Sequence, residues 1–187
     1  TQVGEDPLGG FSSGLGTWIS VKDRTGNLYP DISKNNQGEA VLNPEKETSL
    51  SIELMLKIPE IVNDTQVIVQ KISGSSSGYT LHLDPSTSTQ YVSGVFSVAS
   101  GSIKNHVSAL LEKGIFNHIC VTLNKDEAVD KLQFYVNEEL KSESSFEKTI
   151  QEMEIENANF FIGSGSSFYS SNNLITPTQT LSGTMDE

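Results

Sequence analysis

The chain has 187 residues and carries 24 acidic residues against 12 Lys and Arg, which gives a formal net charge of −12. This length suits one domain, or two small ones, and lets a folded chain bury roughly 70% of its unfolded surface without covalent or metal cross-links. The acidic balance argues against nucleic acid and anionic membranes as partners, because both are recognised by basic surfaces. The sequence also lacks the run of about 20 apolar residues that would predict membrane insertion.

The first segment of the chain, residues 1–17, is rich in Gly and Ser and has little periodicity. We expect it to be flexible and to precede a single domain over residues 18–187. The single cysteine, Cys120, excludes an intrachain disulfide. Such sparse cysteine use fits a microbial, viral or intracellular protein better than an animal extracellular module.

Four strands are predicted between residues 50 and 99. Residues 50–58 alternate between apolar and mostly polar side chains, which indicates a strand with one buried face. Pro59 ends this strand. Residues 66–72, 79–83 and 91–99 form the next three, with a Gly/Ser turn over residues 74–78 and a bulge or close approach expected at Gly94. Turn signals every ten or so residues favour an antiparallel sandwich.

The strongest pattern spans residues 115–140 and predicts two amphipathic strands joined by a charged turn. Alternate apolar positions define the predicted buried faces: Ile115, Asn117, Ile119, Val121 and Leu123 before the turn, and Leu132, Phe134 and Val136 after it. We expect Leu54, Leu56, Val121, Phe134 and Val136 to be nearly fully buried. Cys120 is predicted to be a core thiol and His118 a packing residue, and residues 137–139 form a tight turn.

One later segment has a different period. Phe146, Ile150 and Met153 have helical spacing, and Ser144-x-x-Glu147 matches a capping box. These features predict a single helical turn within a loop.

The predicted hairpin resembles the signature of laminin G-like domains in the concanavalin A-like lectin/glucanase superfamily. The matching positions are Phe116, His118, Ile119, Val121 and Thr122, followed by Leu132, Phe134, Tyr135, Val136, Asn137 and Leu140. Residues 21–33, 48–58, 159–163 and 181–187 also resemble segments of that family, in the same order. The sequence departs from the family pattern at two positions. Phe116 stands where the family has Trp, and Glu138 stands where the family has Gly. The resemblance implies an all-β, antiparallel two-sheet jelly-roll sandwich.

That resemblance also implies a function: a non-catalytic recognition or adhesion module that binds glycan or protein through its loop rim or concave face. The alternative is a structural or display domain of a virion, a surface layer or an appendage. Either role predicts an extracellular, cell-surface or virion location. Because the last strand is short, an open sheet edge is expected to accept another segment or a neighbouring subunit. The resemblance further places residues 18–21 beside residues 181–185, with Trp18 buried between them.

Retaining glycoside hydrolases of the same superfamily carry two catalytic carboxylates on one strand face, in the order E-x-D-x-E. Glu152, Glu154 and Glu156 have this spacing. The sequence departs from this pattern in two ways, however. The middle residue is Glu instead of Asp. The motif also comes after the hairpin in this chain, whereas in the hydrolases it comes before the equivalent segment. We therefore expect a solvated acidic loop and no enzymatic activity. No nucleophile elbow or zinc motif accompanies the three histidines.

Calcium is the one metal that the sequence suggests, because one loop is rich in the oxygen ligands it prefers. The predicted ligands are Asp23, Asn27 and Asp31, and the resemblance brings Asp186 to the same place. The alternative is that the three loop residues form Asx turns. A weaker site at the loop rim would use the strand-end residues Asp84, Asp126 and Asp130.

A glycan site needs an aromatic platform with amide or carboxylate partners for sugar hydroxyls. The candidate platforms are Tyr91, Phe168 and Tyr169, and the candidate amides are Asn172 and Asn173. Four of these five residues lie in residues 163–177, which we predict to be a long polar loop of the kind that carries function.

Overall fold

A computed structural model describes residues 42, 44, 49–125, 129–147, 150, 153, 155, 158–178 and 180–182 in full. It also describes the backbone of strand residues 2–3, 19–20 and 184–186. Every regular element in these residues is a β-strand. Within the same residues, no helix has the length and apolar character needed to cross a membrane.

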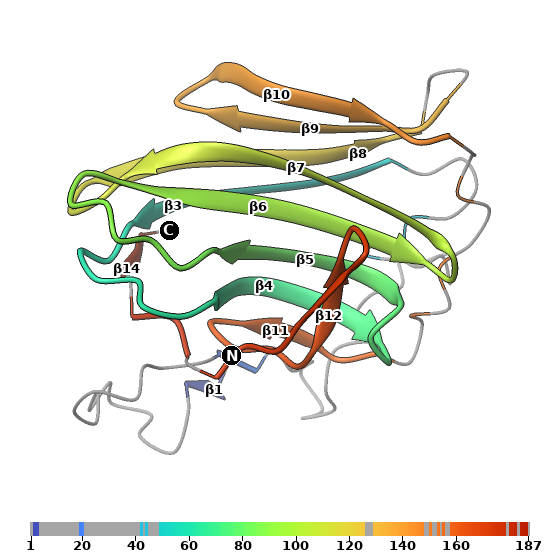
Figure 1. Cartoon of the computed structure of the whole chain (residues 1–187), viewed down its shortest axis with the longest axis horizontal. Helices are drawn as coiled ribbons and strands as arrows, with labels where there is room; N and C mark the ends of the chain where they lie inside the picture. The colour runs from blue at the N-terminus through green and yellow to red at the C-terminus, as the bar shows by residue number, and fades with distance from the viewer. Residues whose placement is uncertain are drawn as a thin grey trace.

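The strands alternate with short turns along most of the chain (Figure 1). They are β1 (Gln2–Val3), β2 (Ile19–Ser20), β3 (Leu50–Lys57), β4 (Gln66–Ser73), β5 (Ser77–Leu83), β6 (Tyr91–Ser100), β7 (Ile103–Glu112), β8 (Phe116–Asn124), β9 (Lys131–Val136), β10 (Glu139–Ser145), β11 (Phe160–Ile162), β12 (Phe168–Ser170), β13 (Asn173–Ile175) and β14 (Thr184–Asp186).

Two antiparallel sheets form the body of the fold. In the described residues, a seven-stranded sheet has the order β1-β2-β11-β4-β5-β6-β7, and a five-stranded sheet has the order β10-β9-β8-β3-β14. A separate hairpin, β12–β13, crosses in front of the larger sheet (Figure 1). The prediction of an all-β, antiparallel two-sheet sandwich is therefore confirmed.

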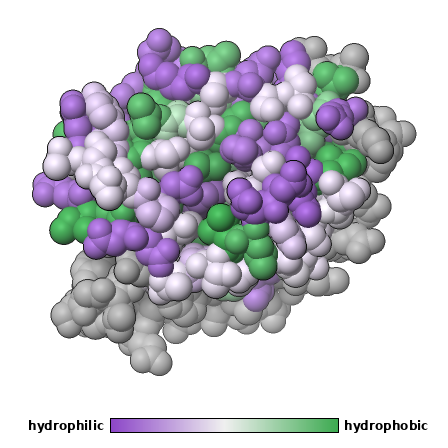
Figure 2. Space-filling view, viewed as in Figure 1, coloured by the Kyte–Doolittle hydropathy of each residue, from purple (hydrophilic) through white to green (hydrophobic). Residues whose placement is uncertain are grey.

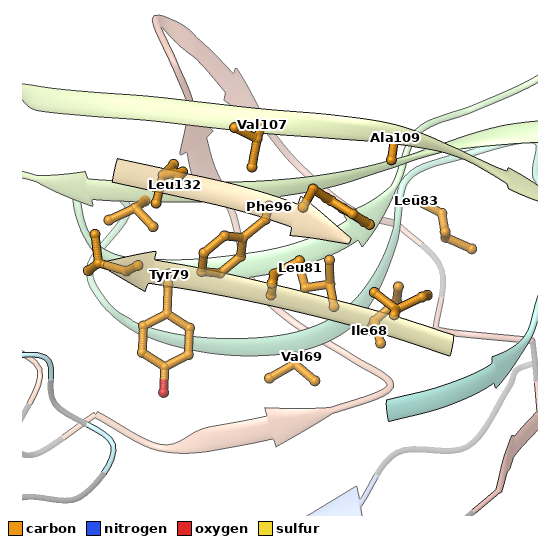
Figure 3. Close-up of a cluster of buried hydrophobic side chains, with 14 of the residues drawn as sticks. Ile68, Val69, Tyr79, Leu81, Leu83, Phe96, Val107, Ala109 and Leu132 are labelled. Atoms are coloured by element: carbon orange, nitrogen blue, oxygen red, sulfur yellow. The ribbon is translucent and has the colours of Figure 1, made fainter. Parts of the chain in front are cut away.

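The inner faces of the two sheets meet in one hydrophobic core, because alternate residues of each strand point to the same side. Figure 3 shows part of this core, with side chains from β4 to β7 lying beside Leu132 of β9. Four of the five residues predicted to be buried are so: Leu56, Val121, Phe134 and Val136. The fifth, Leu54, is only partly buried and packs against the edge of the core cluster.

Gly94 marks a close approach between strands, which is one of the two roles predicted for it. The pairing of β6 with β7 runs through Gly94 without a register shift, so the bulge is absent. A Cβ atom at this position would lie 2.6 Å from Leu111 Cδ1 and 3.1 Å from Phe134 Cζ. Glycine is thus required where the Phe134 ring reaches across the core to β6.

The turn predicted over residues 137–139 is a tight hairpin connection between β9 and β10. Asn137 and Glu138 both adopt positive φ, at 51° and 69°. Two-residue hairpin turns require this backbone conformation, which asparagine tolerates and glycine prefers at the second position. Glu138 therefore occupies the position that the family fills with Gly, at some cost in backbone strain.

The predicted capping box and the predicted core thiol are both wrong. Ser144 lies within β10 and does not cap a helix. Phe146, Ile150 and Met153 are buried in the core cluster, and residues 148, 149, 151 and 152 of the predicted helical turn lie outside the described residues. Cys120 is not a core thiol, because it alternates with the buried Val121 and lies half-buried on the outer face of β8. Burial, followed by the nearby Glu53 carboxylate, raises the pKa of the Cys120 thiol.

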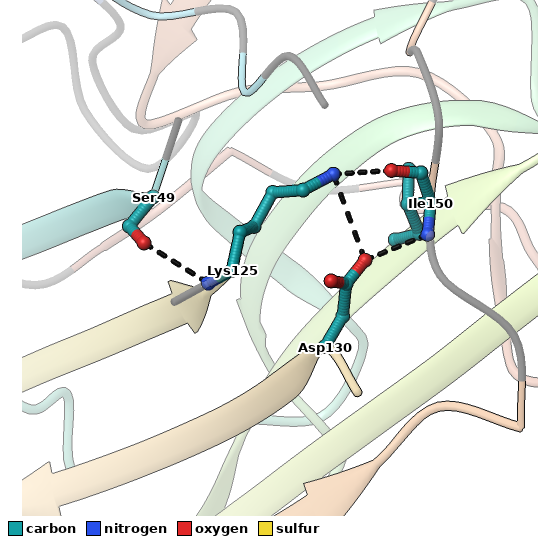
Figure 4. A network of polar contacts seen from close by, with 4 residues as sticks. All are labelled: Ser49, Lys125, Asp130 and Ile150. Atoms are coloured by element: carbon teal, nitrogen blue, oxygen red, sulfur yellow. Dashed lines mark hydrogen bonds and ion pairs between the residues drawn. The ribbon is translucent and has the colours of Figure 1, made fainter. Parts of the chain in front are cut away.

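The segment after β10 is tied to the sandwich by a buried ion pair (Figure 4). Asp130 Oδ2 lies 3.6 Å from Lys125 Nζ and accepts a hydrogen bond from Ile150 N at 2.6 Å. Lys125 Nζ donates to Ile150 O, and Lys125 N donates to Ser49 Oγ at 2.9 Å. Burial lowers the pKa of the Lys125 ammonium, and the charge and hydrogen bond of Asp130 oppose that shift.

The network in Figure 4 also corrects the weaker metal prediction. Asp130 is buried and committed to Lys125, so it is not available at the loop rim. Asp84 lies beside His82 on a different sheet, and Asp126 lies outside the described residues.

The first and last strands lie in different sheets, which contradicts the predicted pairing of residues 18–21 with residues 181–185. β2 pairs with β11 in the seven-stranded sheet, whereas β14 pairs with β3 in the five-stranded sheet. Leu181 N nevertheless donates to Gly163 O at 2.8 Å, one residue beyond the end of β11. Trp18 lies outside the described residues. The domain boundary at residue 17 stays a prediction.

Candidate functional site

The outer face of the seven-stranded sheet carries the β12–β13 hairpin, and we call this surface the hairpin face. Its strand residues alternate with the core residues of β4 to β7 and point away from the second sheet. Figure 2 views the molecule from this side and shows small hydrophobic areas separated by hydrophilic ones. Such a mixture of apolar and polar groups is what a sugar-binding surface needs.

The hairpin is fixed to the sheet by polar contacts. Gln70 Oε1 accepts a hydrogen bond from Ser166 N at 2.8 Å, and Gln70 Nε2 donates to Ser166 O at 3.1 Å. Further along, Ser97 Oγ donates to Ser170 Oγ at 2.9 Å. Gly165 permits this approach, because a Cβ there would lie 2.8 Å from Gln70 Oε1. The segment predicted as a long polar loop is thus an ordered hairpin.

Phe168 anchors the hairpin and is not an exposed platform. Its side chain is 1% exposed and packs edge-on against His82, with 4.8 Å between the ring centroids. His82 Nε2 lies 3.3 Å from Asp84 Oδ1. Because Phe168 alternates with Tyr169 in a short strand, one ring is directed at the sheet while the other is directed outward. The ring of Phe168 is therefore buried in this structure and offers no exposed surface on which a ligand could stack.

Tyr91 lies at the other end of this face, where β6 begins. It is 37% exposed, and Leu110 of β7 is 66% exposed. Tyr91 pairs with Glu112 and Leu110 pairs with Ser93, so Tyr91 and Leu110 are diagonal neighbours on one face. We call these two side chains the Tyr91 platform. The hydroxyl of Ser93 and the carboxylate of Glu112 flank it, so an apolar surface is bordered by hydrogen-bonding groups.

The loop before Tyr91 is ordered by serine side chains. Ser88 Oγ accepts hydrogen bonds from Gln90 N at 3.2 Å and Tyr91 N at 3.1 Å. Ser86 Oγ donates to Tyr91 O at 2.8 Å, and Lys113 Nζ donates to Ser88 O at 2.6 Å. The aromatic ring is therefore held on a pre-formed loop, which reduces the entropy lost on binding.

Tyr169 lies at the hairpin end of the face. Its ring lies beneath Lys104, whose Nζ is 3.7 Å from the ring centroid. Asn172 lies in the hairpin turn, Asn173 begins β13, and both are exposed. Tyr169 N donates to Ser75 O at 3.0 Å, which fixes this end of the hairpin near the β4–β5 turn.

The predicted site residues therefore form two groups rather than one. The hairpin is bonded to β6 at Ser97, six residues beyond Tyr91, which places the two groups about 20 Å apart along the strand. Tyr91 stands at one end, and Tyr169, Asn172 and Asn173 stand at the other. A face of this length suits an extended ligand better than a single sugar.

The opposite face of the sandwich has a hollow of its own. It has a volume of about 460 Å³ and is lined by Glu53, Met55, His118, Asn137 and Glu138. His118 Nε2 lies 2.6 Å from Glu53 Oε1, and His118 N donates to Asn137 Oδ1 at 3.0 Å. His118 is thus a partly exposed residue that is hydrogen-bonded to Glu53, and not the packing residue that we predicted.

The calcium prediction lies outside the described part of the chain. Asp23, Asn27 and Asp31 are not among the described residues, and only the backbone of Asp186 is described. In its register, Asp186 lies opposite Met55 of β3. Among the residues that the structure describes in full, no group of three or more His, Cys, Asp or Glu side chains is placed to hold a metal ion.

Comparison with known proteins places the chain in a family. Residues 33–187 match the family model of the concanavalin A-like lectin/glucanases superfamily. The chain belongs to this superfamily. No curated protein matches the sequence. The resemblance seen in the hairpin motif is therefore confirmed over most of the chain.

Solved structures share the fold at low sequence identity. The CBM40 of Ruminococcus gnavus IT-sialidase bound to α2,3-sialyllactose is 11% identical, with a TM-score of 0.56 over 91% of this chain and 84% of that one. The same CBM40 bound to α2,6-sialyllactose is 14% identical, with a TM-score of 0.52 over 92% and 89% of the two chains. At these identities, the likeness shows a common fold.

Sequence reasoning missed the residues that β7 contributes to the hairpin face. Leu110 extends the Tyr91 platform and Lys104 lies over Tyr169, yet neither stood out in the sequence. The signal was present as the alternation of Val107, Ala109 and Leu111 with more polar residues. The consecutive Leu110 and Leu111 obscured it, because an exposed leucine breaks the period of two.

Proposed function

We propose that this superfamily member is a non-catalytic glycan-binding module that holds an extended saccharide along the hairpin face. The observation that carries the proposal is the Tyr91 platform, an exposed aromatic ring beside Leu110 on a rigid sheet. The apolar face of a sugar stacks on such a ring while hydroxyl and carboxylate groups nearby bind its hydroxyls. The CBM40 structures, which share the fold and hold sialyllactose, also support a glycan as the ligand.

Replacing Tyr91 with Ala is expected to weaken binding to the best ligand on a glycan array by roughly tenfold or more, because an aromatic anchor is lost. Calorimetric titration of wild type and variant with that ligand measures the change. Phe116→Ala is the matched control, since Phe116 is 41% exposed but lies on β8 in the other sheet. Equal affinities of the two variants would show that the ligand does not use the platform.

The proposal includes the absence of turnover. Met153 and Ile155, which alternate with the acidic residues of the E-x-E-x-E stretch, are buried in the core cluster. Glu152, Glu154 and Glu156 themselves lie outside the described residues. We expect the purified chain to release no sugar from β-glucans or sialosides, and Glu152→Gln and Glu154→Gln to change nothing. Hydrolysis that either substitution abolishes would make the protein a glycoside hydrolase.

One observation favours the alternative of a structural or display domain. Exposed apolar side chains, Ile61, Ile115 and Phe116, lie near one end of the sandwich, where Ile58 N donates to Ile115 O at 3.1 Å. Exposed apolar patches often mark protein contacts. If the glycan array is blank while light scattering shows stable self-association that Ile115→Ser abolishes, this alternative replaces glycan binding.

A further inference from the structure

The hairpin end of the face borders a pocket that no prediction above includes. It has a volume of about 300 Å³ and lies where β7 begins and β10 ends. We call it the seam pocket, and its lining consists of residues 102–105 and 145–147. Asn105 holds the two walls together, since its Nδ2 donates to Ser145 O at 3.0 Å and its Oδ1 accepts from Ser144 Oγ at 3.1 Å. The pocket is therefore pre-formed.

Lys104 is the one basic residue among the described residues that line the seam pocket. Its ammonium lies over the ring of Tyr169 and forms no ion pair with a carboxylate of the described residues. By contrast, Lys125, Lys131 and Lys141 each pair with a carboxylate. The cation–π contact fixes the ammonium without neutralising it.

The remaining lining groups select among anions. Glu147 is exposed in the lining, and its carboxylate disfavours an anion placed beside it but accepts hydrogen bonds from the hydroxyls of a sugar. Ser102 and Ser145 add hydroxyls that both donate and accept. The apolar part of the lining comes from Ile103 and Phe146. The combination fits a ligand that carries one carboxylate together with several hydroxyls and an apolar ring face.

From this geometry, we propose that the seam pocket binds a carboxylated sugar, with Lys104 as the partner of the carboxylate. The shared chemistry includes both uronic acids and sialic acids. This inference rests on the proposed function, because it assigns the acidic residue of the same saccharide to the hairpin end of the face. The Tyr91 platform would then hold the neutral part of the chain.

The test uses two probe pairs that differ only in the carboxylate: α2,3-sialyllactose against its methyl ester, and trigalacturonate against its methyl ester. We expect the wild-type chain to bind the acidic member of at least one pair roughly tenfold more tightly. The pair that shows the preference identifies the source of the carboxylate. Lys104→Met should abolish the preference and leave the affinity for the neutral member unchanged, while Lys104→Arg should retain it. Amide shifts on binding should include residues 102–105 and 145–147.

Lys57→Met is the matched control, because Lys57 is an exposed lysine on β3 of the other sheet. The inference is overturned if the wild type binds neither acidic probe, if it binds acidic and neutral members equally, or if Lys104→Met keeps the preference. Equal binding of both members that Tyr91→Ala weakens would overturn this inference alone and leave the proposed function intact. Thermal melting checks that each variant folds.

Discussion

Phe134→Ala is expected to destabilise the domain by about 3–5 kcal/mol, because it removes a fully buried ring and leaves a cavity between the sheets. The ring reaches the backbone of β6 at Gly94, so little in its surroundings can collapse into the space. In a domain of this size, each kcal/mol lowers the melting temperature by about 2–4 °C, so the shift should be on the order of ten degrees. Thermal and urea unfolding of the purified chain measure it.

Phe116→Ala is the control for this prediction, because it removes the same side chain from an exposed position on β8. Its effect should remain below about 0.5 kcal/mol. Val121→Ala tests the neighbouring strand, since Val121 pairs with Phe134 and is also fully buried. Unchanged melting temperatures for both Phe134→Ala and Val121→Ala would mean that the hairpin strands are wrongly assigned.

Asp130→Ala is the second substitution with a large expected effect. It would leave the Lys125 ammonium buried without its carboxylate and Ile150 N without its acceptor. Removing one partner of a buried ion pair lowers the free energy of unfolding by about 3–5 kcal/mol, mostly because the remaining charge is uncompensated. Urea unfolding should show a loss of this size, and the segment that holds Ile150 should become more accessible to proteases.

The double variant Lys125→Met/Asp130→Leu separates charge burial from packing. It removes both charges and fills the space with apolar side chains, so it should be more stable than Asp130→Ala alone. If the double variant were as unstable as Asp130→Ala, the cost would come from lost packing. The buried pair would then play no electrostatic role in holding the segment.

The strands that could be predicted from the sequence are those whose two faces differ in polarity. Strand β8 alternates buried Val121 with half-buried Cys120 and Thr122, and the pattern shows directly in its residues. By contrast, β10 was missed because it is polar on both faces and covers no core of its own. It forms a strand because it pairs with β9, and this tertiary contact leaves no alternating pattern of polarity in the sequence of β10.

The candidate site was predictable in its residue types but not in its arrangement. Tyr91 and Tyr169 were identified as possible platforms because a glycan site needs an aromatic side chain beside hydrogen-bonding groups. Their separation along β6 depends on where the β12–β13 hairpin docks, and that is decided by Gln70 and Ser97 from distant strands. The burial of Phe168 could not be predicted for the same reason, since its contact with His82 exists only once the hairpin lies on the sheet.

Chemical-shift mapping of a bound glycan on the isotope-labelled chain tests the central claim most directly, because it reports which face the ligand covers. Glycan binding along the hairpin face predicts that the amides of Tyr91, Ser93, Ser108 and Leu110 shift on titration, while those of Glu53, His118 and Asn137 on the opposite face do not. Shifts confined to the opposite face, or no shifts with any ligand identified on the array, would contradict it.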